Sequence, residues 1–149
     1  MNPIKQKLFD LCTRYAEQRV VTVQEAIRSA RESSESDTKS SAGDKYETGR
    51  EMMQQEIARN EQQLHEARKL LHAMSRIPVK DCSTGSPGAL VITDRERFYL
   101  SISAGQLELD GTTYFAISPT SPIGLKLGGL QAGDQFTFNQ KSFTIQQIM

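Results

Sequence analysis

The chain has 149 residues, of which 37% are hydrophobic, and its 18 basic and 18 acidic side chains give a formal net charge of zero. Nonspecific nucleic-acid binding is therefore not expected as the main function, because proteins of that class carry a clear basic excess. No apolar run approaches the roughly 20 residues that a membrane-spanning helix requires, and no signal peptide is evident. We expect a cytoplasmic protein without a membrane partner, in which Cys12 and Cys82 are free thiols.

Charged and aromatic side chains are divided unequally along the chain. Seven of the ten aromatic residues (four Tyr and six Phe in all) lie after Gly88, whereas charged residues are concentrated before it. A charge-rich first half with few aromatic residues is typical of long solvent-exposed helices, and the second half has the composition of an ordinary compact domain. The two halves are therefore expected to differ in architecture.

The first predicted helix covers residues 3–34. Its apolar positions, mostly at helical spacing, are Ile4, Leu8, Leu11, Tyr15, Val20, Val23, Ile27 and Ala30. This stripe loses register near residues 18–22, where the sequence from Thr22 to Glu25 also matches a capping box. Two interpretations remain open: a break between two helices, or a kink or stutter within one continuous helix.

The second predicted helix covers residues 44–77, and Pro78 ends it. Its heptad seam consists of Tyr46, Gly49, Met53, Ile57, Asn60, Leu64, Ala67, Leu71 and Met74. At 1.5 Å per residue this helix would be roughly 50 Å long. A helix of that length has no core of its own, so it needs a partner, and the first helix supplies one.

Residues 32–43 are small and polar throughout. They cannot bury an apolar surface, so they are expected to form the turn between the two helices. Folding the chain about Ser40 brings the two seams together in these opposing pairs: Ile27 with Met53, and Val23 with Ile57. Residues 1–78 are therefore predicted to form an antiparallel two-helix coiled-coil hairpin.

Residues 79–88 contain glycine and proline and are expected to be a linker. Short alternating runs then predict strands at residues 90–93, 97–103, 106–109, 112–117, 135–138 and 142–148. Asp110-Gly111 and Asn139-Gln140 suit two-residue hairpin turns.

Ser121-Pro122 predicts the start of one short helix, which ends near Leu127 at a glycine pair. Residues 89–149 are therefore expected to be a small antiparallel β domain with one helix across its sheet. The chain as a whole is predicted to be α+β, with the hairpin first and the β domain second.

Two groups of motifs resemble those of a known family. The first group, on the hairpin, comprises Ala26–Glu32, Asp37-Thr-Lys39, Tyr46 and Arg50-Glu51. The second and more specific group, in the β domain, comprises Ile117–Gly124, Leu127–Leu130 and Gly133-Asp134. Together they resemble the Gre-type bacterial transcript-cleavage factors over nearly the whole chain, with only the N-terminal end matched loosely.

The resemblance implies that the β domain is FKBP-like and docks at the rim of the secondary channel of RNA polymerase. The implied docking residues are Ser118, Pro119, Ser121, Pro122, Ile123 and Gly124. The hairpin would enter the channel, where Lys39, Lys45 and Arg50 would come close to nascent RNA. Such a factor is not a freestanding enzyme, has no cofactor of its own, and is expected to bind core polymerase as a monomer.

In this family, acidic residues at the hairpin tip help to hold a catalytic Mg²⁺ in the polymerase active site, and oxygen ligands suit that ion. The family pairs an Asp with a Glu three residues later, whereas here Asp37 is followed at that position by Ser40. Asp44 is the candidate for the second acid, so Asp37 and Asp44 are the predicted catalytic and metal-directed side chains, assisting in trans. Alternatively Asp44 serves only the helix start, because Ser41-Ala-Gly-Asp44 resembles a capping box.

Three functions therefore remain open. The chain stimulates cleavage of backtracked RNA by the polymerase, or it occupies the secondary channel without cleavage, or it is a coiled-coil adaptor unrelated to transcription. A small polar tip favours the first two, because an adaptor has no need of one. A prolyl isomerase would rest on fold analogy alone.

Overall fold

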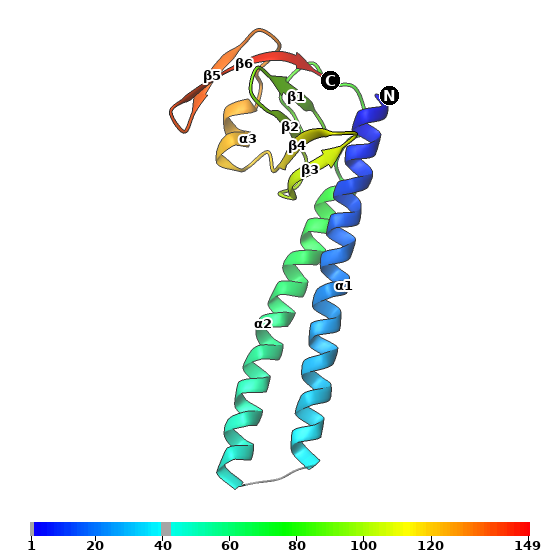
Figure 1. Cartoon of the computed structure of the whole chain (residues 1–149), viewed down its shortest axis with the longest axis vertical. Coiled ribbons are helices and arrows are strands. Elements are labelled where there is room, and N and C mark those ends of the chain that lie inside the picture. Colours follow the sequence, from blue (N-terminus) through cyan, green and yellow to red (C-terminus); the bar gives the residue numbers. More distant parts are fainter. Residues whose placement is uncertain (1, 40–42) are drawn as a thin grey trace. The chain divides into compact units, whose positions relative to one another are not determined.

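The computed structural model describes residues 2–39 and 43–149, with the side chains of residues 34–48 left out. The chain forms two compact units, one holding the residues up to Tyr15 and from His72 onward, and the other holding Ala16–Leu71. Two long helices, α1 (Pro3–Lys39) and α2 (Gly43–Ser75), contribute to both units (Figure 1). None of the helices in the described ranges combines the length and the apolar character needed to cross a membrane.

α1 is one continuous helix, without a break at residues 18–22. Its buried positions are Lys5, Leu8, Cys12, Ala16, Val23, Ile27 and Ala30. The predicted stripe was wrong at its start, because Ile4 is 37% exposed whereas Lys5 is only 2% exposed. Steps of three and four residues through Cys12 and Ala16 keep the helical period intact. The apparent loss of register came from assigning the seam to the larger side chains of Leu11 and Tyr15, which are half-buried, in place of Cys12 and Ala16.

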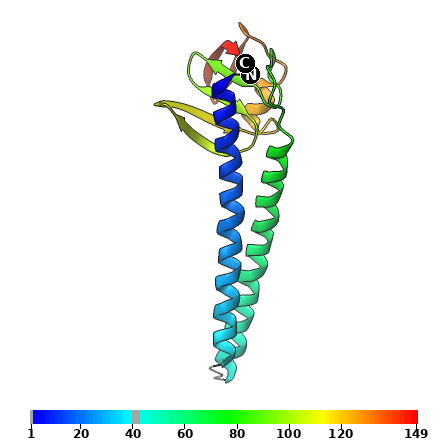
Figure 2. The same ribbon diagram turned by 90° about the vertical axis from the view of Figure 1, so that its right-hand side faces the viewer.

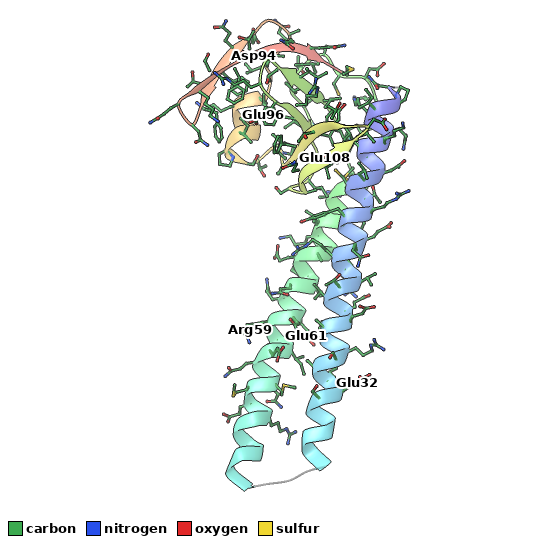
Figure 3. The ribbon with its side chains drawn as sticks, viewed as in Figure 1. Glu32, Arg59, Glu61, Asp94, Glu96 and Glu108 are labelled. Atoms are coloured by element: carbon green, nitrogen blue, oxygen red, sulfur yellow. The ribbon has the colours of Figure 1, made fainter. Side chains whose placement is uncertain are left out.

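The predicted seam of α2 is confirmed from Gly49 to Met74, whereas the side chain of Tyr46 lies outside the described residues. From Glu51 to Met74 every predicted seam position is buried or half-buried, and all the other positions except Leu70 are exposed. Arg59 is one of the charged side chains that project from the exposed face of α2 (Figure 3). The turn predicted for residues 32–43 was too long, because α1 continues to Lys39 and α2 begins at Gly43. Each residue added to an existing helix gains a backbone hydrogen bond, which outweighs the weak helix propensity of the polar residues there.

In the second unit, α1 and α2 lie side by side and antiparallel (Figures 1 and 2). Arg31 of α1 and Glu61 of α2 form an ion pair, with Nη2 and Oε1 3.0 Å apart. Ile27 lines the same pocket as Leu64, rather than pairing with Met53 as expected. Leu64 lies eleven residues beyond Met53 along α2, so the two seams meet in a different register from the one expected for a chain folded about Ser40.

The first unit is built around a six-stranded sheet in the order β3-β4-β2-β1-β6-β5. Its strands are β1 (Leu90–Thr93), β2 (Arg97–Leu100), β3 (Gly105–Leu109), β4 (Thr112–Ile117), β5 (Gln135–Phe138) and β6 (Lys141–Ile148). Neighbouring strands are antiparallel except β2 and β4, which pair in parallel. The predicted antiparallel sheet was wrong at this pair. The chain reverses at β3 and again at β4, so β4 returns in the direction of β2.

Both predicted hairpin turns are confirmed. The backbone φ angles are 51° and 78° at Asp110 and Gly111, and 50° and 64° at Asn139 and Gln140. Positive φ at both central residues is the geometry of a type I′ turn, which matches the twist of the flanking strands. The core of the sheet is formed by Ala89, Val91, Phe98, Leu100, Leu127, Phe143 and Ile145.

The segment predicted as a linker is hydrogen-bonded to the β domain. The backbone N–H of Gly85 donates to the carbonyl oxygen of Leu130 at 2.8 Å, and that of Gly88 donates to Leu100 at 2.7 Å. The segment therefore belongs to the same compact unit as the sheet.

Candidate functional site

The predicted docking motif forms the entry to α3 (Pro122–Leu127). Ser121 has an extended backbone, with φ −69° and ψ 161°, and its Oγ accepts a hydrogen bond from the N–H of Gly124 at 3.1 Å. Pro122 follows at the start of the helix, as predicted, where its missing N–H costs no hydrogen bond. The Ser121 hydroxyl also donates to the carbonyl oxygen of Ser118 at 2.6 Å. One side chain therefore joins the helix start to the preceding turn.

The preceding turn is tightly packed. The hydroxyls of Ser118 and Thr120 lie 2.9 Å apart, and the Thr120 N–H donates to Ser118 Oγ at 3.2 Å. Gly124 is buried, and a Cβ there would overlap the carbonyl oxygen of Ser118 and lie 2.9 Å from the carbonyl carbon of Pro119. Ser118, Ser121 and Gly124 therefore shape the turn through local contacts.

Of the six predicted docking residues only Pro122 is exposed, whereas Ser118, Pro119, Ser121 and Ile123 are half-buried and Gly124 is buried. Ile123 packs against the core and Leu127 is fully buried, since they lie four residues apart on one face of the helix. Leu125 lies on the opposite face and is 68% exposed, next to the exposed Pro122 and Lys126. Sequence reasoning missed Leu125. The spacing of Ile123 and Leu127 is the signal that could have identified it.

The predicted tip residues lie at the ends of the two long helices. Asp37 and Lys39 belong to the last turn of α1, and Asp44 and Lys45 to the first turn of α2. Their side chains lie outside the described residues, and so does the capping box proposed for Asp44. Arg50 is described and exposed.

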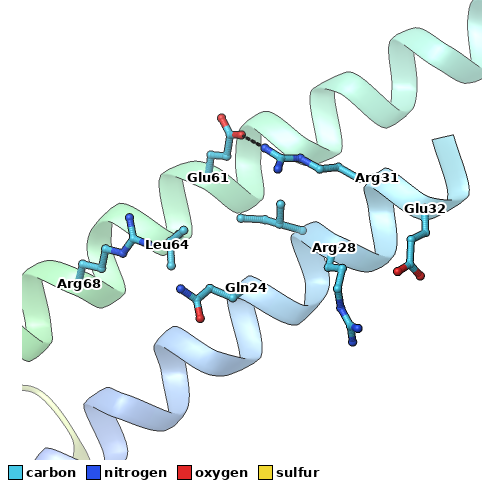
Figure 4. A pocket seen from close by; sticks show the side chains of 8 residues that line it. Gln24, Arg28, Arg31, Glu32, Glu61, Leu64 and Arg68 are labelled. Carbon is cyan, nitrogen blue, oxygen red and sulfur yellow. Dashed lines mark hydrogen bonds and ion pairs between the residues drawn. The ribbon is translucent and has the colours of Figure 1, made fainter. Parts of the chain in front are cut away.

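A groove of about 450 Å³ lies between α1 and α2 in the second unit. It is lined by Gln24, Ile27, Arg28, Arg31, Glu32, Glu61, Leu64 and Arg68. Figure 4 shows Arg31 reaching across to Glu61, so this ion pair closes part of the groove. The sequence alone did not predict a groove at this position.

A buried polar cluster in the first unit was also missed. Lys5 donates from Nζ to the main-chain oxygens of Lys80 at 2.7 Å and Met149 at 3.1 Å, and it lies 3.9 Å from Cys82 Sγ. On the same helix, the Cys12 sulfur lies 3.6 Å from Ser101 Oγ. The hydrophobic periodicity of a sequence does not reveal a buried lysine, because lysine counts as a polar residue. Its long aliphatic stem can nevertheless be buried while its ammonium donates to oxygen acceptors.

Burial raises the pKa of Cys12 in this cluster and of the nearby Tyr99. It raises the pKa of the Cys12 thiol to about 11, against a smaller opposing contribution from the hydrogen bond with Ser101. Burial also raises the pKa of Tyr99, and the nearby Cys12, Cys82 and Asp10 add to this effect. Both groups are therefore protonated at neutral pH.

Metal ligands do not gather within the described residues. There, no group of three or more His, Cys, Asp and Glu side chains has an arrangement that could hold a metal ion.

No protein-family model matches the chain, and no curated protein matches it. Among solved structures, three chains match. One of them is the structure of the transcription factor Gfh1, which is 21% identical in sequence, with 92% of each chain covered and a TM-score of 0.37.

Proposed function

We propose that the chain is a Gre-like regulator of transcription elongation. It binds RNA polymerase through its β domain and inserts the tip of its hairpin into the secondary channel. The polymerase performs all covalent chemistry, so the chain is not an enzyme by itself.

The observation that carries this proposal is the turn before α3. The residues that resemble the family signature fold into a turn whose shape is fixed by Ser118, Ser121 and Gly124. That turn leaves Pro122 and Leu125 exposed. An exposed leucine beside a proline on a rigid helix start is a suitable anchor for a partner, because it is desolvated on binding at little conformational cost.

The hairpin supports the proposal independently. The hairpin consists of two helices of 37 and 33 residues, and the sequence between their apolar seams is polar. A channel-inserting element needs length and stiffness, and an uninterrupted α1 with a regular seam supplies both. A coiled-coil adaptor would use the same seam, but it would not require the docking turn in a separate β domain.

Binding to purified core RNA polymerase tests this proposal. Leu125→Glu should weaken binding at least tenfold, because it places a charge in an apolar contact. Val79→Glu is the matched control, since Val79 is a 46% exposed apolar residue of the same unit outside the turn. Both substitutions are at exposed positions, so both variants should fold. If the full chain fails to bind polymerase, the proposed function is wrong. If Val79→Glu weakens binding as much as Leu125→Glu, the docking surface has been assigned to the wrong residues.

A further inference from the structure

Lys5 is the most deeply buried charged residue among those described, with 2% of its surface exposed. Its ammonium has three N–H groups to satisfy. Two of them have oxygen acceptors, the main-chain oxygens of Lys80 and Met149, at 2.7 and 3.1 Å. The remaining neighbour is Cys82 Sγ at 3.9 Å. Sulfur is a weak acceptor, so the third N–H is poorly satisfied.

The Cys82 thiol is oriented to leave its sulfur facing that ammonium. Its S–H donates to the carbonyl oxygen of Lys80 at 3.5 Å, so its own proton is directed at the oxygen that also accepts from Lys5. An oxygen atom added to the sulfur would be a much stronger acceptor than the sulfur itself. It would complete the coordination of a buried cation that now has two oxygen partners.

The two cysteines of the chain differ sharply in access. Cys82 is partly exposed, whereas Cys12 is fully buried and burial raises its pKa to about 11. Oxidation by peroxide requires that the oxidant reach the sulfur, and a neighbouring cation favours the attack. Cys82 meets both conditions and Cys12 meets neither. The oxidation rates of the two cysteines can therefore be compared within the same chain.

We propose that Cys82 is a peroxide-modified thiol whose oxidised sulfur is held by the Lys5 ammonium. The Cys82 thiol gives its proton to water, the sulfur attacks one oxygen of hydrogen peroxide, an S–O bond forms, and the O–O bond breaks. The sulfur loses two electrons to the peroxide, whose other oxygen leaves as hydroxide and is protonated to water. The product is a sulfenic acid, and a second peroxide converts it to a sulfinate by the same two-electron step. Its oxygen accepts the third hydrogen bond of Lys5.

The test treats the full-length chain with hydrogen peroxide and maps oxygen addition by peptide mass analysis, with a cyclic diketone to trap sulfenic acid. Cys82 should react at least tenfold faster than Cys12. The thermal midpoint of the oxidised protein should rise by about 2–4 °C, because a charge-assisted hydrogen bond is gained in a buried site. Cys82→Ser should abolish the rise.

Lys5→Met removes the cation and should slow Cys82 oxidation several-fold and eliminate the rise in midpoint. Lys7→Met is the matched control, because Lys7 lies on the same helix with its side chain 56% exposed. That variant should behave like the unsubstituted chain. If Lys5→Met does not fold, the relative oxidation rates of Cys82 and Cys12 and the shift in thermal midpoint of the unsubstituted chain still test the proposal. Equal reactivity of Cys82 and Cys12, or a fall in midpoint on oxidation, would overturn the proposal.

Discussion

Gly124 packs against Ser118 so closely that no side chain fits between them. A Cβ at Gly124 would overlap the Ser118 carbonyl oxygen and lie 2.9 Å from Ser121 Oγ, which caps α3. Gly124→Ala should therefore destabilise the protein by about 1–3 kcal/mol, through overpacking and disturbance of the cap. Urea denaturation measures this loss.

Gly49→Ala is the control for the Gly124 prediction. Gly49 lies within α2, and a Cβ there would meet nothing within 4 Å. Alanine has a higher helix propensity than glycine, so this variant should gain up to about 1 kcal/mol. The turn has been described wrongly if both alanine variants shift stability in the same direction.

Two valines of α1, two residues apart, differ in burial and should therefore differ in their effect on stability when substituted. Val23 is 7% exposed and Val21 is 44% exposed. Val23→Asp buries an uncompensated charge between the helices and should cost about 3–5 kcal/mol. Val21→Asp should change stability by about 0.5 kcal/mol or less, because its side chain remains in water. Loss of helical circular dichroism with temperature measures both. Similar midpoints for the two variants would be incompatible with the antiparallel hairpin.

The sequence predicted the hairpin well because burial in a two-helix seam depends mainly on local period. The positions of α2 from Met53 to Met74 follow from spacing alone, and so do the type I′ turns, whose residues must accept positive φ. Neither feature requires knowledge of distant contacts.

The errors arose where a distant partner decides the outcome. Lys5 is buried because Lys80 and Met149 supply oxygen acceptors more than seventy residues away along the chain. β4 pairs with β3 along one edge and with β2, in parallel, along the other. Which strand occupies that second edge depends on contacts outside the β3–β4 hairpin. The start of α3 at Ser121-Pro122 was predicted correctly, but which residues around it remain exposed depends on how α3 packs on the core. The four-residue spacing of Ile123 and Leu127 indicates the buried face of α3, and the packing of Leu127 on the core shows that Leu125 lies on the exposed face.

Cys12 predicts a loss of stability in alkaline solution. Burial raises the pKa of its thiol from the ordinary value of 9.0 to about 11. Because the folded protein keeps this proton to a higher pH, the stabilising contribution is complete below pH 9.0 and is lost as the pH rises to about 11. Two pKa units correspond to about 2–3 kcal/mol.

Urea denaturation on either side of pH 9.0 measures this dependence. Cys12→Ala lowers stability at every pH by creating a cavity, but it should flatten the alkaline slope. Some slope will remain in that variant, because burial also raises the pKa of Tyr99. If Cys12→Ala unfolds with an undiminished alkaline slope, Cys12 is not the group that controls it.

Substitutions at the tip acids distinguish stimulation of RNA cleavage from occupancy of the channel without cleavage. Mg²⁺ takes oxygen ligands, and a carboxylate supplies the charge that a neutral amide lacks. If the tip assists hydrolysis of backtracked RNA, the unsubstituted chain raises cleavage in stalled elongation complexes. Asp37→Asn should then abolish that stimulation while leaving polymerase binding intact. A chain that binds polymerase and never raises cleavage would be a channel-occupying regulator.

Asp44→Asn distinguishes a metal-directed carboxylate from a residue that serves only the helix start. Asp44 is the second residue of α2, a position where a carboxylate is favoured by the helix dipole. Asparagine can still accept a hydrogen bond from the first turn, so a purely structural role predicts nearly full cleavage activity and at most about 1 kcal/mol of lost stability. A metal-directed role predicts loss of stimulation as complete as that of Asp37→Asn, because the amide carries no charge to offset the ion. We expect Asp44→Asn to lose the stimulation of cleavage and to keep its affinity for polymerase. A cleavage assay run beside a binding measurement distinguishes the metal-directed role from the structural one. Retained cleavage in Asp44→Asn would leave Asp37 as the single acid contributed by the tip.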